Sequence, residues 1–403
     1  MAPGAPPPSS EPAFEASAAR KALSVFFLSG LLLSFPGAIL PAWGYHIQAD
    51  YSRVGLYFLG ICVGILLSVK AAPYISTRRG IRFVLILGGG LAAGSFLYLA
   101  LVSPPAHFGL RVAGMASVGL SSGMLTNAAF HIITPIYHHN PAATVNLAGT
   151  MFGLGCLAMA LLVSGTFYVY TVPSILILIA LIPGFMTGHF ARSSFVVPPE
   201  APEPPLGQVW QDFRSLGAVL FSLILFFQFG NEWSVAGWLA LFLTRRIGMS
   251  PAASLQMLAM YWLALLVGRG AAQWLLPRVS HGKLLTASVA TAMTGCGVLI
   301  MTNNRFGAAA GVLFVGGGFA MIYPLVVEKI GHRFPYYRPG FFNGLFSFAI
   351  AGGFLAPWAL GFLADVWEIQ VVMALPLIGT VMVFVLLVLL WIETRLTAAA
   401  GQR

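Results

Sequence analysis

The chain has 403 residues, of which only 8% are charged and 58% are hydrophobic, and its mean hydropathy is +0.87. Soluble globular proteins carry roughly 25% charged residues, so this composition excludes an ordinary water-soluble enzyme as well as a disordered or fibrous chain. The net charge of +10 does not indicate a nucleic-acid partner here. In so apolar a chain, basic residues are typical of the cytoplasmic loops of a membrane protein.

The first residues are rich in Pro, Ala and Ser, and we predict a disordered cytoplasmic tail over 1–21. Apolar stretches of about 20 residues, the length that spans a bilayer as a helix, then follow one another along the chain. We count twelve of them, at roughly 22–48, 54–76, 83–102, 109–131, 143–167, 173–191, 215–243, 251–276, 284–302, 307–328, 341–364 and 370–391. The sequence therefore predicts an all-α, multi-pass membrane protein.

The longest polar segment divides the predicted spans into two sets of six. We expect an N-terminal six-helix bundle over 22–191, a cytoplasmic linker over 192–214, a C-terminal six-helix bundle over 215–391 and a cytoplasmic tail over 392–403. With the N-terminus inside, 16 of the 21 Lys and Arg residues fall toward the cytoplasmic side. Such an excess predicts that both termini are cytoplasmic and that the chain lies among the lipids of the inner cell membrane.

A basic turn recurs after the second span of each half, and duplicated six-helix halves are a transporter architecture. The first of these turns resembles the signature loop of the major facilitator superfamily. Arg78, Gly80 and Arg82 match that pattern, whereas Pro73 replaces a Gly and Thr77 replaces an Asp that helps to latch the cytoplasmic gate. The resemblance implies twelve transmembrane helices in two six-helix pseudo-repeats, with Arg78, Gly80 and Arg82 in gating.

A narrower resemblance is to the fucose and glucose–galactose permease branch of that family. It is carried by residues 230–239 in the seventh span, by Tyr261, Trp262 and Arg269 in the eighth, and by residues 352–365 in the eleventh. The resemblance implies a sugar as substrate and adds Arg269 to the gating residues. Proton-coupled relatives carry acids in the first and fourth helices, and this chain has none there.

Glu232 is the only acidic residue well inside a predicted span. A charged acid at the bilayer centre costs roughly 2.5–3.5 kcal/mol, so Glu232 is expected to bind substrate, to couple transport to a proton or sodium ion, or to join helices by hydrogen bonds. Tyr261 and Trp262 share its expected depth, whereas Arg269 lies roughly 10 Å closer to the cytoplasm. We therefore expect no direct Glu232–Arg269 ion pair unless a helix bends.

Amide, carboxylate and aromatic side chains suit the hydroxyl groups and apolar ring faces of a sugar. Gln228 precedes Glu232 by one helical turn and so shares its helix face. Several of the other candidates can equally be structural or packing residues. The predicted substrate-binding residues are Gln228, Asn231, Glu232, Tyr261, Trp262, Asn127, Tyr323, Asn343 and Trp358, with Glu232 also in ion coupling.

No Walker-type phosphate loop is present, so the sequence predicts neither an ATP-driven pump nor an enzyme, and we expect no cofactor or metal site. We predict a monomeric secondary active transporter that moves a small polar solute, most directly a sugar, by alternating access. Symport with a proton or sodium ion and uniport both remain open. Two alternatives are an exporter of amphipathic compounds or drugs, which the 31 Phe and 14 Met would suit, and a non-transporting receptor or scaffold.

Overall fold

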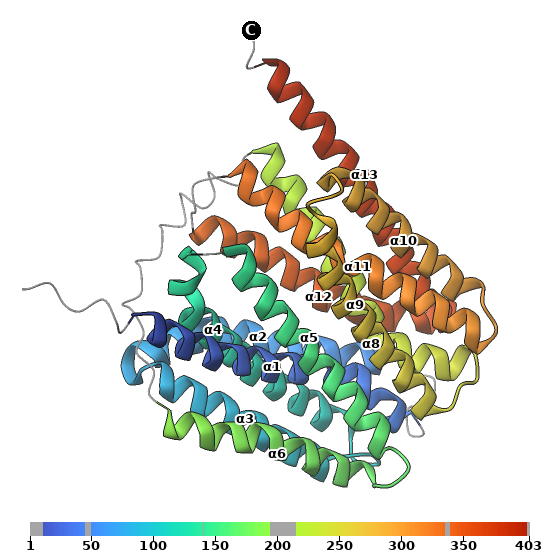
Figure 1. Cartoon of the computed structure of the whole chain (residues 1–403). Helices are drawn as coiled ribbons and strands as arrows, with labels where there is room; N and C mark the ends of the chain where they lie inside the picture. Colours follow the sequence, from blue (N-terminus) through green and yellow to red (C-terminus); the bar gives the residue numbers. More distant parts are fainter. Residues whose placement is uncertain (1–10, 45–49, 140, 194–214, 335–338, 401–403) are drawn as a thin grey trace, which may run out of the picture.

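The computed structural model describes the backbone of residues 11–44, 50–139, 141–193, 215–334 and 339–400. Within these ranges the chain forms twelve α-helices and no strand, which confirms the predicted all-α fold class (Figure 1). The helices are α1 Glu11–Trp43, α2 Tyr51–Arg79, α3 Ile81–Leu101, α4 Phe108–His139, α5 Pro141–Thr166, α6 Val172–Arg192, α8 Leu216–Arg246, α9 Pro251–Leu275, α10 His281–Met301, α11 Arg305–Arg333, α12 Pro339–Trp367 and α13 Val371–Ala400.

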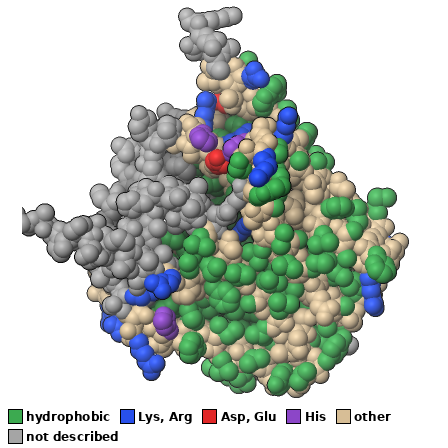
Figure 2. All heavy atoms as spheres, viewed as in Figure 1, with side chains coloured by type: hydrophobic (Ala, Val, Ile, Leu, Met, Phe, Trp, Pro, Cys, Tyr) green, Lys and Arg blue, Asp and Glu red, His purple; other side chains and the backbone are tan. Residues whose placement is uncertain are grey.

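The surface of the molecule is apolar enough to contact lipid. Over the described residues, eleven helices, all except α4, are long and apolar enough to cross a membrane. Figure 2 shows hydrophobic side chains across the middle of one face, with Lys and Arg toward its margins. Large apolar side chains such as Leu101, Phe185 and Phe306 are exposed, which water would disfavour and hydrocarbon does not. The chain is therefore an integral, multi-pass membrane protein.

The structure corrects the predicted N-terminal tail, because helix α1 begins at Glu11 and residues 11–21 are helical rather than disordered. Helix α13 continues to Ala400, so most of the predicted C-terminal tail is also helical. Both segments are rich in residues of high helix propensity, namely Ala, Glu and Arg, together with Lys in the first segment and Leu in the second. Such residues favour a helix outside the membrane as well as within it. The predicted linker over 192–214 lies outside the described residues from 194 onward.

Three helix pairs occur at equivalent places in both halves of the chain. In the first half, α1 packs on α5, α2 on α4 and α3 on α6. In the second half the helices at the equivalent places pair likewise, α8 with α12, α9 with α11 and α10 with α13. The predicted duplication of a six-helix unit is thus present in the packing and not only in the number of spans.

Contacts between the halves join α2 with α12, α5 with α9 and α1 with α8. We call the end of the molecule where α1 finishes and α2 begins the far end, and the end where α1 begins and α13 finishes the terminal end. In Figure 1 the helices of the two halves converge toward the far end, at the lower right, and diverge toward the terminal end.

Glycine allows the two halves to touch through their backbones near the far end. A Cβ atom added to Gly361 of α12 would lie 2.6 Å from the carbonyl oxygen of Tyr51 in α2, and one added to Gly37 of α1 would lie 2.1 Å from that of Ala236 in α8. Both distances are too short for a side chain. Because hydrocarbon provides no hydrophobic drive between helices, such close packing is what joins them in a membrane.

Candidate functional site

Glu232 and Arg269 form a buried ion pair in the middle of the second half. The Nη2 atom of Arg269 lies 3.8 Å from Oε1 of Glu232, and the two side chains are only 11% and 10% exposed. Our expectation that these residues do not pair is therefore wrong. Glu232 lies about 14 residues from the far end of α8 and Arg269 about 18 residues from that of α9, a depth difference of about 6 Å, which the long arginine side chain bridges.

Arg269 also reaches across to the first half of the molecule. Its Nη1 atom donates a hydrogen bond of 2.8 Å to the backbone carbonyl oxygen of Gly149 in α5. A Cβ atom at Gly149 would lie 3.0 Å from that nitrogen, so the absence of a side chain leaves room for the guanidinium group. One arginine thus connects the central acid of one half to the backbone of the other.

Several polar atoms around this pair are buried without a hydrogen-bond partner. They include both amide atoms of Gln228, Nε1 of Trp262 and Nε of Arg269. The amide group of Gln228 lies near the Glu232 carboxylate, but not in hydrogen-bonding geometry. Leaving such a group unpaired costs about 1–3 kcal/mol, so these atoms are candidates for contact with water or with a polar ligand.

Tyr261 and Trp262 occupy the positions expected from their depth beside Glu232. The hydroxyl group of Tyr261 donates to the backbone carbonyl oxygen of Glu232 at 3.2 Å and ties α9 to α8. The Trp262 ring lies 6.0 Å from that of Trp233, edge to face. The structure therefore brings Gln228, Glu232 and these two aromatic residues together.

Trp233 is a residue that our sequence reasoning missed. Its ring centroid lies 6.0 Å from Phe152 of α5, 6.0 Å from Trp262 of α9 and 6.1 Å from Phe354 of α12. It is the aromatic contact between the central site and the first half. Trp233 directly follows Glu232 within the motif that resembles the sugar permeases, and this position could have identified it as a site residue.

Asn231 points away from its neighbour Glu232. Its Nδ2 atom donates to the hydroxyl oxygen of Thr380 in α13 at 3.3 Å, and a Cβ atom at Gly379 would collide with its side chain at 2.0 Å. The residue before Glu232 thus joins α8 to α13 inside the second half. A role in substrate binding finds no support in this geometry.

The remaining substrate candidates are spread over three helices. Asn127 is exposed on α4. Tyr323 of α11 packs its ring 5.1 Å from that of Phe229. Trp358 of α12 lies nearer the far end, where its backbone approaches α2, and the side chain of Asn343 lies outside the described residues. Of these residues, Tyr323 contacts the helix of Glu232, through Phe229 one turn before it.

The predicted gating residues of the first basic turn make contacts within the first half. Gly80 links α2 to α3 with φ of +81°, which glycine adopts without strain. Arg82 donates from Nη2 to the carbonyl oxygen of Ala191 at the end of α6, and the Arg78 guanidinium lies 4.3 Å from the ring centroid of Tyr74. Of the four predicted gating residues, Arg269 is the one whose described contact crosses between the halves.

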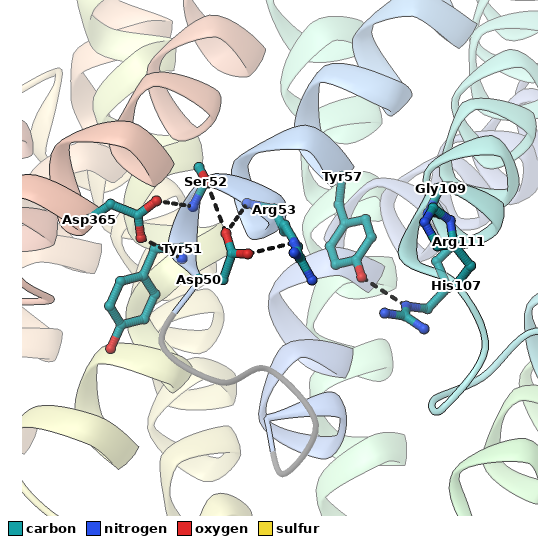
Figure 3. Close-up of polar contacts among 9 residues, drawn as sticks. All are labelled: Asp50, Tyr51, Ser52, Arg53, Tyr57, His107, Gly109, Arg111 and Asp365. Atoms are coloured by element: carbon teal, nitrogen blue, oxygen red, sulfur yellow. Dashed lines mark hydrogen bonds and ion pairs between the residues drawn. The ribbon is translucent and has the colours of Figure 1, made fainter.

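The first half has a buried charge of its own, Arg111 of α4 near the far end (Figure 3). Its Nε atom donates to the hydroxyl oxygen of Tyr57 at 2.8 Å and its Nη1 atom to the carbonyl oxygen of Ala106 at 2.6 Å. The guanidinium group also lies 5.7 Å from the ring centroid of Trp43. Neutral groups solvate this arginine, which makes it a structural contact. Elsewhere in the described chain, no three His, Cys, Asp or Glu residues gather as metal ligands would.

Two six-helix halves packed about a buried acid–arginine pair define a membrane transporter fold. The chain belongs to the Major Facilitator Superfamily, whose sequence profile matches residues 22–357. It is similar to an uncharacterized MFS-type transporter of Yersinia pestis, with 22% identity over 347 residues that cover 86% of this chain and 88% of the relative. The protein is accordingly of a transporter family and not an enzyme.

Solved structures agree on the fold. A mutant of the nucleoside transporter NupG matches with a TM-score of 0.72 and 11% identity, over 92% of this chain and 99% of that chain. The transporter FucP in its outward conformation matches with a TM-score of 0.60 and 17% identity, over 91% and 97%. A variant of the E. coli fucose:proton symporter FucP matches with a TM-score of 0.61 and 17% identity, over 93% and 98%.

Proposed function

We propose that this protein is a secondary active transporter that moves a small polar solute, with a sugar as the first candidate, by alternating access between its two halves. The observation that carries this proposal is the Glu232–Arg269 pair, which contacts both halves and has unpartnered polar atoms of Gln228 and Trp262 beside it. A solute rich in hydroxyl groups offers donors and acceptors to all of these atoms, and its apolar face suits the neighbouring indole rings.

The pair also supplies a route for ion coupling. Arg269 divides its guanidinium group between the Glu232 carboxylate and the Gly149 carbonyl. A proton or a sodium ion bound at Glu232 weakens the attraction between Glu232 and Arg269, and Arg269 then binds more firmly to α5. Because charges interact strongly in a medium of low dielectric constant, one bound ion alters the contact between the halves.

The terminal end is the cytoplasmic side in this proposal, because most Lys and Arg residues fall there. The membrane is the inner cell membrane, and the moving bodies are the predicted bundles over 22–191 and 215–391. A monomer contains both halves and suffices for alternating access.

A nucleoside is the second candidate substrate. NupG, which is titled a nucleoside transporter, matches with a higher TM-score than FucP does. In addition, Trp233, which follows Glu232 in sequence, contacts the rings of Phe152 and Trp262, and aromatic side chains of this kind suit the stacking of a nucleobase.

Uptake into proteoliposomes tests this function directly. We expect the purified protein to take up a labelled monosaccharide or nucleoside, and to concentrate it only when an inward proton or sodium gradient is imposed. Glu232→Gln should abolish gradient-driven accumulation and retain exchange at equilibrium, whereas the control Glu328→Gln, in α11, should accumulate solute like the wild type. Wild-type accumulation by Glu232→Gln would leave Glu232 a merely structural residue.

The same preparation distinguishes the alternatives. Thermal stabilisation by lipophilic cations rather than by monosaccharides or nucleosides would support an exporter of amphipathic compounds. Absence of flux for every solute in the panel, by a protein that is folded and correctly inserted, would support a receptor or scaffold.

A further inference from the structure

Asp365 connects the two halves at the far end through an unusual contact. It lies two residues before the end of α12, in the second half, and its carboxylate accepts hydrogen bonds from the first two backbone N–H groups of α2, in the first half. Its Oδ1 atom lies 2.7 Å from the nitrogen of Tyr51 and its Oδ2 atom 2.9 Å from that of Ser52 (Figure 3). Asp365 follows the predicted span over 341–364, and the structure places it in the last turn of α12.

This contact is electrostatically favourable. The first N–H groups of a helix have no partner within the helix, and the helix dipole places a partial positive charge at the same end. A carboxylate that accepts two of these N–H groups makes charge-assisted hydrogen bonds, which are about twice as strong as neutral ones. Asp365 thus joins its own half to the other half by one of the stronger contacts available to a side chain.

Helix α2 does not need Asp365 in order to begin. Asp50, which belongs to the same half, is its N-cap and accepts from the backbone nitrogen of Arg53 at 3.3 Å and from the hydroxyl group of Ser52 at 2.9 Å. The charge of Asp50 is balanced by Arg53, whose Nε atom lies 2.5 Å from Oδ2. When the halves separate, α2 keeps this cap. The contact with Asp365 is therefore reversible without unwinding the helix.

The duplicated fold provides an internal comparison. The contact equivalent to α12 with α2 is that of α5 with α9, and there Ser164 lies two residues before the end of α5. Its hydroxyl group donates to the carbonyl oxygen of Ala252 at the start of α9, at 3.2 Å. The second interface thus carries a neutral hydrogen bond where the first carries a charged one.

We propose that Asp365 is a latch that holds the far end closed, and that its release from the start of α2 is a required step when the far end opens. The direct approach of α2 and α12 at Gly55 and Gly361 brings the carboxylate within reach. This inference rests on the proposed function, because a latch is needed only if the two halves open and close in alternating access. It concerns the closed contact itself and is independent of substrate and coupling ion.

Pulsed electron paramagnetic resonance on the protein in lipid nanodiscs, without substrate, tests the latch. Leu101 at the end of α3 and Phe306 at the start of α11 are 85% and 89% exposed, so cysteines placed there accept spin labels, while the native Cys62, Cys156 and Cys296 are buried. Asp365→Asn removes the charge and one of the two acceptor oxygens, so it should raise the ratio of long to short label distances about tenfold, the effect of losing a charge-assisted hydrogen bond. Asp50→Asn and Ser164→Ala should change that ratio less than about threefold.

The ratio of long to short label distances in Asp365→Glu, which keeps the charge, should lie between those of the wild type and Asp365→Asn. This variant also tests the latch if Asp365→Asn lowers the yield of folded protein. An unchanged distance distribution in Asp365→Asn, or an equal shift in Asp50→Asn, would overturn the latch. Failure of the transport proposal would be distinguishable, because it would appear as absent solute uptake with the distance shift still present.

Discussion

The two interfaces that the duplicated fold makes equivalent, α2 with α12 and α5 with α9, are held by different chemistry. At the first, an exposed acid, Asp365, binds the start of a helix at the far end, above a glycine contact. At the second, a buried cation, Arg269, binds a backbone carbonyl in the middle of the molecule and shares its charge with Glu232. Equivalent helices therefore meet through unequal contacts.

This difference indicates that the two interfaces have different roles. The contact at Asp365 is exposed, so in the proposed cycle water replaces it when the halves separate, and its strength does not depend on the buried charges. The contact at Arg269 is buried, so its strength depends on the charge at Glu232. We expect variants at the α5/α9 interface to affect ion coupling and variants at the α2/α12 interface to affect mainly the closure of the far end.

The largest effect is expected from Arg269→Ala. Removing the cation leaves Glu232 buried without its partner, a change that typically costs about 3 kcal/mol, and it also removes the contact with Gly149. Thermal unfolding in detergent should show the loss, and gradient-driven uptake should fall at least about tenfold. Adding Glu232→Gln should restore much of the stability but not the uptake. Arg278→Ala is the control, because the described contacts of the Arg278 side chain are with Trp274 one turn earlier. Equal losses in both variants would contradict the assignment.

Gly361→Ala should have the next largest effect. Its Cβ atom would lie 2.6 Å from the carbonyl oxygen of Tyr51, and because that oxygen belongs to a helix backbone, α2 and α12 must move apart at a cost of about 2 kcal/mol. We expect lower thermal stability and longer label distances across the far end. Gly94→Ala, where a Cβ atom meets nothing within 4 Å, should behave like the wild type, and a wild-type distance distribution in Gly361→Ala would refute the close approach.

Arg111→Gln should have a smaller effect, confined to stability. It removes or weakens the hydrogen bonds to Tyr57 and Ala106, for a loss of about 1–2 kcal/mol. Because the described partners of the Arg111 guanidinium are neutral groups of the first half, the ratio of accumulated to equilibrium uptake should stay at the wild-type value. A change in that ratio would show that the buried charge of the first half also takes part in coupling.

Arg82→Ala should have the smallest effect of the four. In this structure Arg82 is exposed and donates to one carbonyl oxygen at the end of α6, and exposed contacts of this kind contribute less than about 1 kcal/mol. Melting temperature and uptake should remain near those of the wild type. An uptake loss of tenfold or more would instead support the gating role that the family resemblance implies for this residue.

Much of the fold followed from the sequence, because a bilayer leaves little choice. Each span must satisfy its own backbone hydrogen bonds and remain apolar for about 20 residues, so length and hydropathy predicted twelve helices in two halves. The scarcity of charge likewise singled out Glu232, since an acid within a span needs a reason to be there. The same scarcity brought Arg269 to notice, although not as the partner of Glu232.

What the tertiary structure decided is which side chains meet. Depth counted along each helix placed Arg269 too far from Glu232, because α8 continues to Arg246, three residues beyond the predicted span, and because the count ignored how far an arginine side chain reaches. Nothing in the sequence indicated that Asn231 turns to Thr380, or that Asp365 caps a helix some 310 residues earlier in the chain. Hydropathy depends on a residue and its neighbours in sequence. Side-chain partnership depends on helix rotation and on which backbones touch, and only the packed molecule determines these.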